Sequence, residues 1–168
     1  METYLDVALT DSGPVELADA VAYYQATADA LADSAATVER GRAAGAALGE
    51  DPMPALGALV ARVPARVRAA PAGALVRTPF GMMTLESYLP TRTLELTVHT
   101  CDLAAALGVS ADVPRAAAAD TFAVVDGLAA AQGRASAALL ALTGRRALTP
   151  ATRSSDAPSC PPELSVFG

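Results

Sequence analysis

Apolar residues recur every three or four positions along almost the whole chain, and this spacing constrains the fold more than any other feature of the sequence. It places apolar side chains on one face of an α-helix, whereas a half-buried β-strand needs alternation with a period of two. No long segment shows that alternation. Alanine, which has the highest helix propensity, accounts for 41 of the 168 residues. We therefore predict an all-α fold with essentially no sheet.

Capping and breaking residues divide the helical pattern into five segments. They span residues 1–9, 15–48, 51–70, 84–107 and 112–142. A break near Asp33 and Ser34 and another at Gly133 are consistent with the pattern, and Pro64 and Pro90 favour bends. Thr84 and Gly108 are expected to cap the two ends of the fourth segment, and an Asp51-Pro52 pair is expected to open the third.

Two further segments of the sequence indicate irregular structure. Residues 71–83 are expected to form one, with an extended piece at 74–77. After Gly144 the composition shifts towards Pro, Ser and Thr. The length suits one domain, which we place at residues 1–144, followed by an irregular tail at 145–168.

Charge and cysteine content exclude several classes of protein. The net charge is −6 and the arginines are dispersed, which argues against binding to nucleic acid. Two cysteines, Cys101 and Cys160, do not make a disulfide framework, and the sequence has no uncharged 18-residue stretch. We therefore expect a cytoplasmic protein that has no signal peptide and binds no membrane. Lysine, asparagine and isoleucine, which have AT-rich codons, are absent. This bias indicates a high-GC bacterium.

The single histidine of the chain lies in the fourth helical segment, within a polar stripe. At about 100° per residue, Arg92, Glu95, His99 and Asp102 fall within about 60° of one another, and the remaining faces are apolar. A helix that is apolar nearly all round is normally buried, so we expect the stripe to face the interior or a cleft. Glu95 and His99, four residues apart, are expected to lie within a few ångströms of each other.

Two interpretations of this stripe remain open. Glu95 and His99 could both bind one divalent metal ion, because side chains at i and i+4 point the same way. They could instead satisfy each other as a structural pair, with Arg92 and Asp102 adding a buried ion pair. A zinc site normally uses at least three protein ligands, and the sequence offers no second histidine.

The segment FGMMTLESYLPTRTLELTVHTCDLAAALG, residues 80–108, resembles the signature of the mycothiol-dependent maleylpyruvate isomerase N-terminal family. This family belongs to the DinB-like four-helix-bundle metal enzymes. Its pattern is an Arg, then E-x-x-x-H-x-x-D-L-A, then A-L-G. Here the pattern is matched by Arg92, Glu95, His99 and Asp102 with the residues after them. The segments VAYYQAT, ALTGR and ELSVFG also resemble family members, so the resemblance covers most of the chain.

The resemblance implies a DinB-like up-down helical bundle whose divalent ion, zinc, is bound by Glu95 and His99. Asp102 would orient the imidazole or the helix, and Arg92 would balance the carboxylates. The ion would activate a low-molecular-weight thiol, mycothiol, as a thiolate that adds to a small electrophilic substrate. The implied activity is isomerisation or thiol transfer, and a homodimer is compatible with it.

One departure from the family concerns its third ligand, a histidine near the end of the first helix, which this sequence lacks. Residues 1–9 resemble the family segment that comes directly after that histidine, so the resemblance implies that most of the first helix is missing and that zinc is bound weakly. A histidine encoded in frame about ten residues before Met1 would favour the enzyme. The alternatives are a non-catalytic helical binding module, in which the Glu95/His99 pair is structural, and a fragment that needs the missing helix to fold.

Other residues are expected to have no chemical role. The angular position of Cys101, about 200° from His99, predicts a buried side chain that fills space. Cys160 is expected to be a free thiol in the tail. Of the adjacent Tyr23 and Tyr24, we expect one to face the core and the other the surface.

Overall fold

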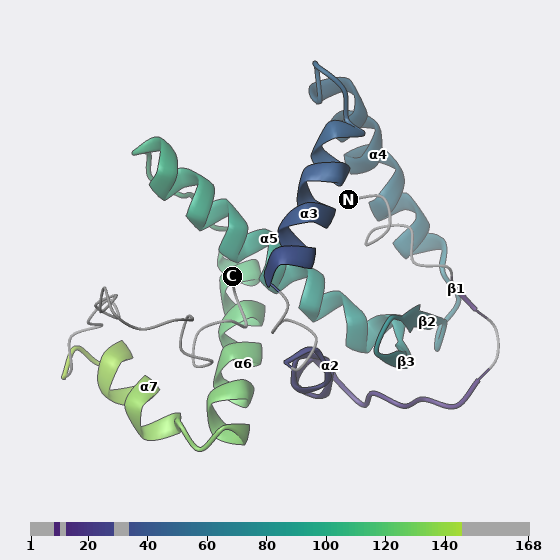
Figure 1. The fold of residues 1–168 in the computed structure, drawn as a ribbon. Coiled ribbons are helices and arrows are strands. Elements are labelled where there is room, and N and C mark those ends of the chain that lie inside the picture. The colour runs from purple at the N-terminus through teal and green to yellow at the C-terminus, as the bar shows by residue number, and fades with distance from the viewer. Residues whose placement is uncertain (1–8, 11–12, 29–33, 146–168) are drawn as a thin grey trace.

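A computed structural model describes residues 9–10, 13–28 and 34–145. Helices dominate it, which confirms the predicted helical class, but a small sheet accompanies them (Figure 1). In chain order the elements are β1 (Leu9–Thr10), α2 (Ala20–Thr27), α3 (Ser34–Ala46), α4 (Met53–Ala69), β2 (Leu75–Thr78), β3 (Gly81–Thr84), α5 (Leu85–Leu107), α6 (Arg115–Ala131) and α7 (Ala135–Leu142). Within these ranges, no helix combines the length and the apolar character needed to cross a bilayer.

The sheet has three antiparallel strands in the order β1-β2-β3, and it corrects two predictions. The predicted loop at 71–83 contains most of a β2–β3 hairpin, in which Leu75 pairs with Thr84. Each strand of this hairpin has only four residues, too few for a period of two to stand out. Leu9, the expected end of a first helix, lies in β1 and pairs with Val76. Residues 1–8, the rest of that predicted helix, lie outside the described residues.

The second predicted helix, 15–48, starts later than its periodicity indicates. The Asp19 carboxylate caps α2 by accepting the Ala22 N–H at 2.8 Å. Before this cap, the backbone N–H groups of Glu16 and Leu17 both donate to the Met82 carbonyl of β3. These contacts with the sheet hold residues 16–17 out of the helix. Downstream, α3 begins at Ser34, next to the predicted break, and residues 29–33 are not described.

Four other predicted capping or breaking residues are confirmed by the geometry at the helix ends, whereas α6 begins at Arg115, three residues after the predicted start at 112. Asp51 Oδ1 accepts the N–H of Met53, the first residue of α4, and Thr84 Oγ1 accepts the Ser87 N–H in the first turn of α5. The backbone φ angles of Gly108 and Gly133 are +68° and +69°, in the left-handed region that favours glycine. Gly108 therefore ends α5, and Gly133 separates α6 from α7, as the sequence predicts.

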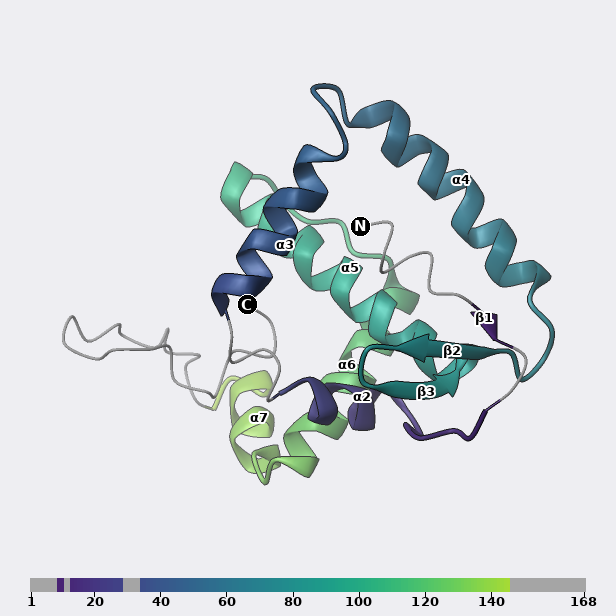
Figure 2. The same ribbon diagram turned by 45° about the vertical axis from the view of Figure 1, so that its right-hand side comes forward.

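The core lies where α2, α5 and α6 meet the hairpin (Figure 2). Both tyrosines of α2 are buried, so the prediction that one of them is exposed is wrong. The Tyr23 ring packs edge-to-face against the rings of Tyr24, Phe80 and Tyr88, at centroid distances of 5.3, 5.6 and 6.1 Å. Because α2 packs against both α5 and α6, more than one of its faces is covered.

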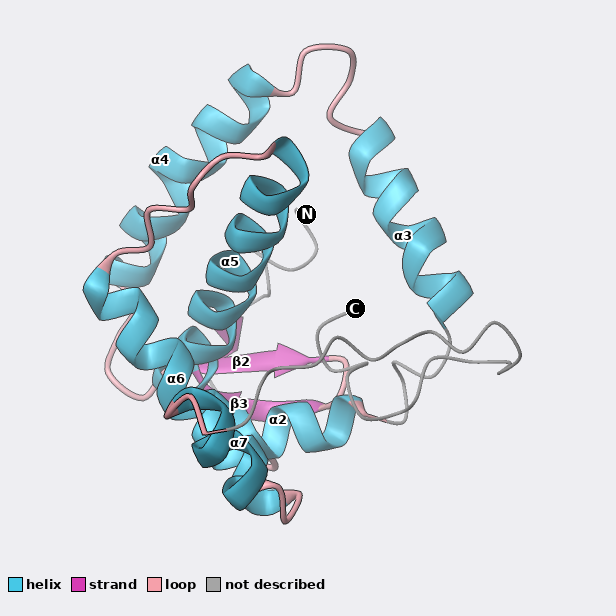
Figure 3. Ribbon diagram, turned by 90° about the vertical axis from the view of Figure 1, so that its left-hand side faces the viewer, coloured by secondary structure: helices cyan, strands magenta, loops and turns pink. Residues whose placement is uncertain are grey.

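One face of α5 is open, which corrects the prediction that this helix is buried all round. Leu94 is fully buried, but Leu96, Leu103 and Leu107 are 66%, 65% and 75% exposed. Cys101, expected to be buried, is also exposed. The reason is that α2, α6 and the hairpin pack mainly on the side of α5 that bears Leu94. In Figure 3, α3 and α4 are joined by a loop at one end and diverge towards the other.

The close approach of α2 to α6 gives a first testable prediction. A Cβ atom added at Gly127 of α6 would lie 2.7 Å from Val21 Cγ2, a stiff β-branched side chain. We expect Gly127→Ala to lower the free energy of unfolding by about 1 kcal/mol, because overpacking outweighs the gain in helix propensity. At Gly57 of α4 an added Cβ has no neighbour within 4 Å, so Gly57→Ala is expected to stabilise. Urea denaturation measures the change in the free energy of unfolding for both variants. An increase for Gly127→Ala would contradict the prediction.

Candidate functional site

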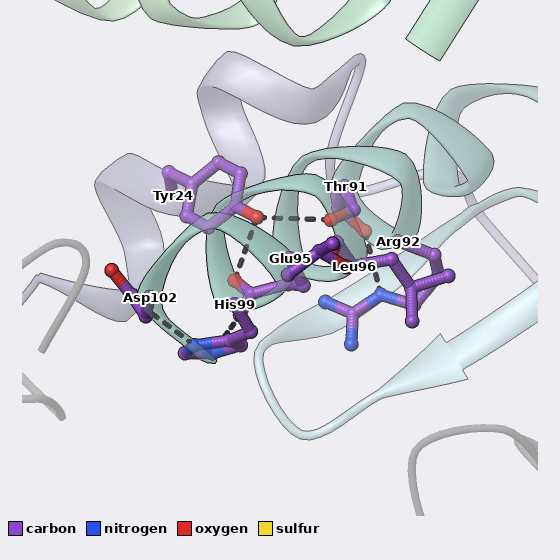
Figure 4. A network of polar contacts seen from close by, with 8 residues as sticks. Tyr24, Thr91, Arg92, Glu95, Leu96, His99 and Asp102 are labelled. Atoms are coloured by element: carbon purple, nitrogen blue, oxygen red, sulfur yellow. Dashed lines mark hydrogen bonds and ion pairs between the residues drawn. The ribbon is translucent and has the colours of Figure 1, made fainter. Parts of the chain in front are cut away.

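The acidic and imidazole side chains of the predicted stripe lie together on α5 (Figure 4). His99 Nε2 is 3.3 Å from Glu95 Oε2, and His99 Nδ1 is 3.3 Å from Asp102 Oδ2. The imidazole therefore lies between two carboxylates, one a turn before it and the other a turn after it. The predicted proximity of Glu95 and His99 is confirmed.

The predicted interior position is wrong for the C-terminal half of the stripe, His99 and Asp102. The side chains of Glu95, His99 and Asp102 are 34%, 57% and 62% exposed, so exposure increases towards the C-terminal end of α5. The helix α2, which contacts Glu95 through Tyr24, has only eight residues and a length of about 12 Å. It covers Glu95 and leaves the next turn of α5 accessible to solvent.

Tyr24 of α2 is the site residue that the sequence did not identify. Its hydroxyl lies 2.8 Å from Glu95 Oε1 and 3.1 Å from the Thr91 carbonyl oxygen. Burial and the neighbouring Glu95 carboxylate raise the pKa of Tyr24 well above its usual value, so the hydroxyl remains a hydrogen-bond donor. Tyr24 and Glu95 are 71 residues apart in the sequence, and no local pattern signals a contact over that separation.

Arg92 lies at the tyrosine cluster, on the N-terminal side of Glu95. Its Nε donates to Thr91 Oγ1 at 3.0 Å, and its guanidinium carbon lies 4.8 Å from the centre of the Tyr88 ring and 5.8 Å from that of Tyr23. These distances are those of cation–π contacts. They hold the Arg92 side chain in place by stacking, and its role in balancing the carboxylates stays a prediction.

The geometry of Glu95 and His99 suits one edge of a zinc site. Two ligand atoms at 2.0–2.1 Å from one ion, separated by the tetrahedral angle, lie about 3.3–3.4 Å apart. The distance between Nε2 and Oε2 is 3.3 Å. The donor types also fit, but the number does not, because the described ranges hold no group of three or more His, Cys, Asp or Glu side chains that could bind a metal. Asp102 contacts the opposite nitrogen of the imidazole, so it does not supply the third ligand.

The contact between Glu95 and His99 is also compatible with a structural ion pair. When the imidazole is protonated, both of its nitrogens donate, and His99 then forms ion pairs with Glu95 and Asp102. Such a pair needs no metal ion.

Comparisons with protein-family models, with curated proteins and with solved structures found no match to this chain. Support for a function therefore comes from the contacts on α5 and from the sequence pattern that contains them. Cys160 and residues 146–168 of the predicted tail at 145–168 lie outside the described residues.

Proposed function

We propose that this chain is a metal-binding protein of the DinB-like, mycothiol-dependent maleylpyruvate isomerase type, with Glu95 Oε2 and His99 Nε2 as two of its zinc ligands. The observation that supports this proposal most is the arrangement of these two atoms, which lie 3.3 Å apart on one face of α5. A bound zinc ion would stabilise the thiolate form of a small thiol such as mycothiol, the nucleophile that adds to an electrophilic substrate.

The surrounding contacts support the same assignment. Histidine ligands commonly donate their second ring N–H to a carboxylate, and ligating carboxylates are themselves hydrogen-bonded. Asp102 is the carboxylate at Nδ1 of His99, which favours the tautomer with its lone pair on Nε2. Because the described residues offer only these two ligands, we expect zinc to bind weakly.

A second candidate is a non-catalytic helical binding module in which Glu95 and His99 form a structural ion pair. The exposure of the imidazole favours it, because an accessible pair is satisfied by water and by its partner without an ion. The two candidates differ in their response to zinc.

Zinc titration followed by proton NMR separates them, because the one histidine of the chain gives unambiguous imidazole signals. We expect zinc to shift or broaden the His99 signals with weak affinity, and His99→Ala to abolish saturable binding measured with a competing zinc indicator. Glu86→Gln, which removes an exposed carboxylate from the first turn of α5, should leave the affinity unchanged. Imidazole signals that do not respond to zinc would contradict the proposal and leave the structural pair. Tight binding by the wild-type chain would show that residues outside the described ranges complete the site.

A further inference from the structure

We infer that Tyr24 is a positioning residue for the Glu95 carboxylate, holding it in the orientation in which Oε2 is available to the metal ion together with His99. This inference rests on the proposed zinc site and adds to it a residue from a second helix. Tyr24 does not contact the ion in this assignment. Its hydroxyl acts through Glu95, and its ring is part of the core.

The hydrogen bond to Glu95 determines which carboxylate oxygen remains available. A tyrosine hydroxyl has one proton to donate, and an ionised carboxylate is a stronger acceptor than a backbone carbonyl. The distances agree with this preference, at 2.8 Å to Glu95 Oε1 and 3.1 Å to the Thr91 oxygen. With Oε1 engaged, the other oxygen, Oε2, faces His99 Nε2.

The position of the hydroxyl is itself fixed. The Tyr24 side chain is almost fully buried and packs perpendicular to the Tyr23 ring. Thr27 Oγ1 donates to the Tyr24 carbonyl, which adds a contact in the last turn of α2. Glu95, in contrast, is one-third exposed and would sample several rotamers without this contact. A rigid donor on α2 therefore limits the motion of a flexible acceptor on α5.

The test compares Tyr24→Phe with Tyr23→Phe. Both substitutions keep an aromatic ring in the core, but only the first removes the hydroxyl at Glu95. Zinc affinity of the full chain is measured by competition with an indicator and by the imidazole signals of His99. We expect Tyr24→Phe to weaken zinc binding about 10- to 100-fold, the usual cost of losing a group that orients a ligand, and Tyr23→Phe to stay within about twofold of wild type.

The possible results distinguish this inference from the proposed function. If the wild-type chain does not respond to zinc, the proposed metal site is wrong and the inference with it. If wild type responds and Tyr24→Phe binds equally well, only the inference is overturned. Equal losses in both variants would show a general effect of core changes, and would also overturn it. Circular dichroism and the dispersion of the methyl signals establish that each variant is folded before its affinity is compared.

Discussion

Leu94→Ala is expected to lower the free energy of unfolding by about 2–5 kcal/mol, the usual cost of truncating a fully buried leucine. The Leu94 side chain is completely inaccessible and belongs to the core that joins α5 to α2, α6 and the hairpin. Its loss removes apolar burial and leaves a cavity. Urea denaturation followed by circular dichroism measures the change.

Leu96→Ala is the matched control for this prediction. Leu96 lies two residues further along α5 and is 66% exposed, so the same substitution there should change stability by no more than about 0.5 kcal/mol. The two variants differ in burial alone, since helix, residue type and chemical change are the same. Similar losses at both positions would show that the Leu96 face of α5 is covered in solution.

The stability of the protein is expected to fall steeply above about pH 10 because of Tyr24. The pKa of its hydroxyl is raised in the folded state, by burial first and by Glu95 second, while in the unfolded chain it is near 10. Above pH 10 the unfolded state has lost this proton and the folded state still holds it. The unfolded state therefore binds fewer protons, and the contribution of Tyr24 lowers stability by about 1.4 kcal/mol for each pH unit.

Tyr24→Phe isolates this contribution from the other titrating groups. At pH 7 we expect the variant to be about 1 kcal/mol less stable than wild type, because a part-buried hydrogen bond to a carboxylate is lost. The difference in the free energy of unfolding should vanish near pH 11 and reverse at higher pH, because only wild type loses stability through Tyr24 in alkaline solution. Urea denaturation at pH 7, 9, 10 and 11 gives the two curves. Parallel curves over this range would mean that Tyr24 ionises as easily in the folded protein as in the unfolded chain.

The features that the sequence predicted correctly are those set by local chemistry. The Asp51 carboxylate and the Thr84 hydroxyl bind free N–H groups at the starts of α4 and α5, and Gly108 and Gly133 adopt the left-handed conformation after α5 and α6. The contact between Glu95 and His99 is equally local, since four residues along a helix bring two side chains together.

The features that the sequence missed depend on packing between distant segments. Hydrogen bonds from Glu16 and Leu17 to Met82 keep these two residues out of α2, and the periodicity of residues 15–19 does not indicate these bonds. Leu96 is exposed because α2, α6 and the hairpin pack on the opposite side of α5, and the apolar composition of α5 does not reveal which side they cover. The role of Tyr24 was missed for the same reason, because its partner Glu95 lies on another helix.

The contacts of residues 16–24 also have a consequence for synthesis on the ribosome. Glu16 bonds to Met82, Ala18 to Ser87 and Tyr24 to Glu95, across separations of 66, 69 and 71 residues. At roughly 5–20 residues per second, the ribosome needs about 3–14 s to make the partner of each after the residue itself. During this interval the two tyrosines of α2 lack Phe80, in the β2–β3 turn, and their partners on α5. The nascent chain therefore presents an aromatic segment that a chaperone is able to bind, and the docking of α2 on α5 is also the step that assembles the candidate site.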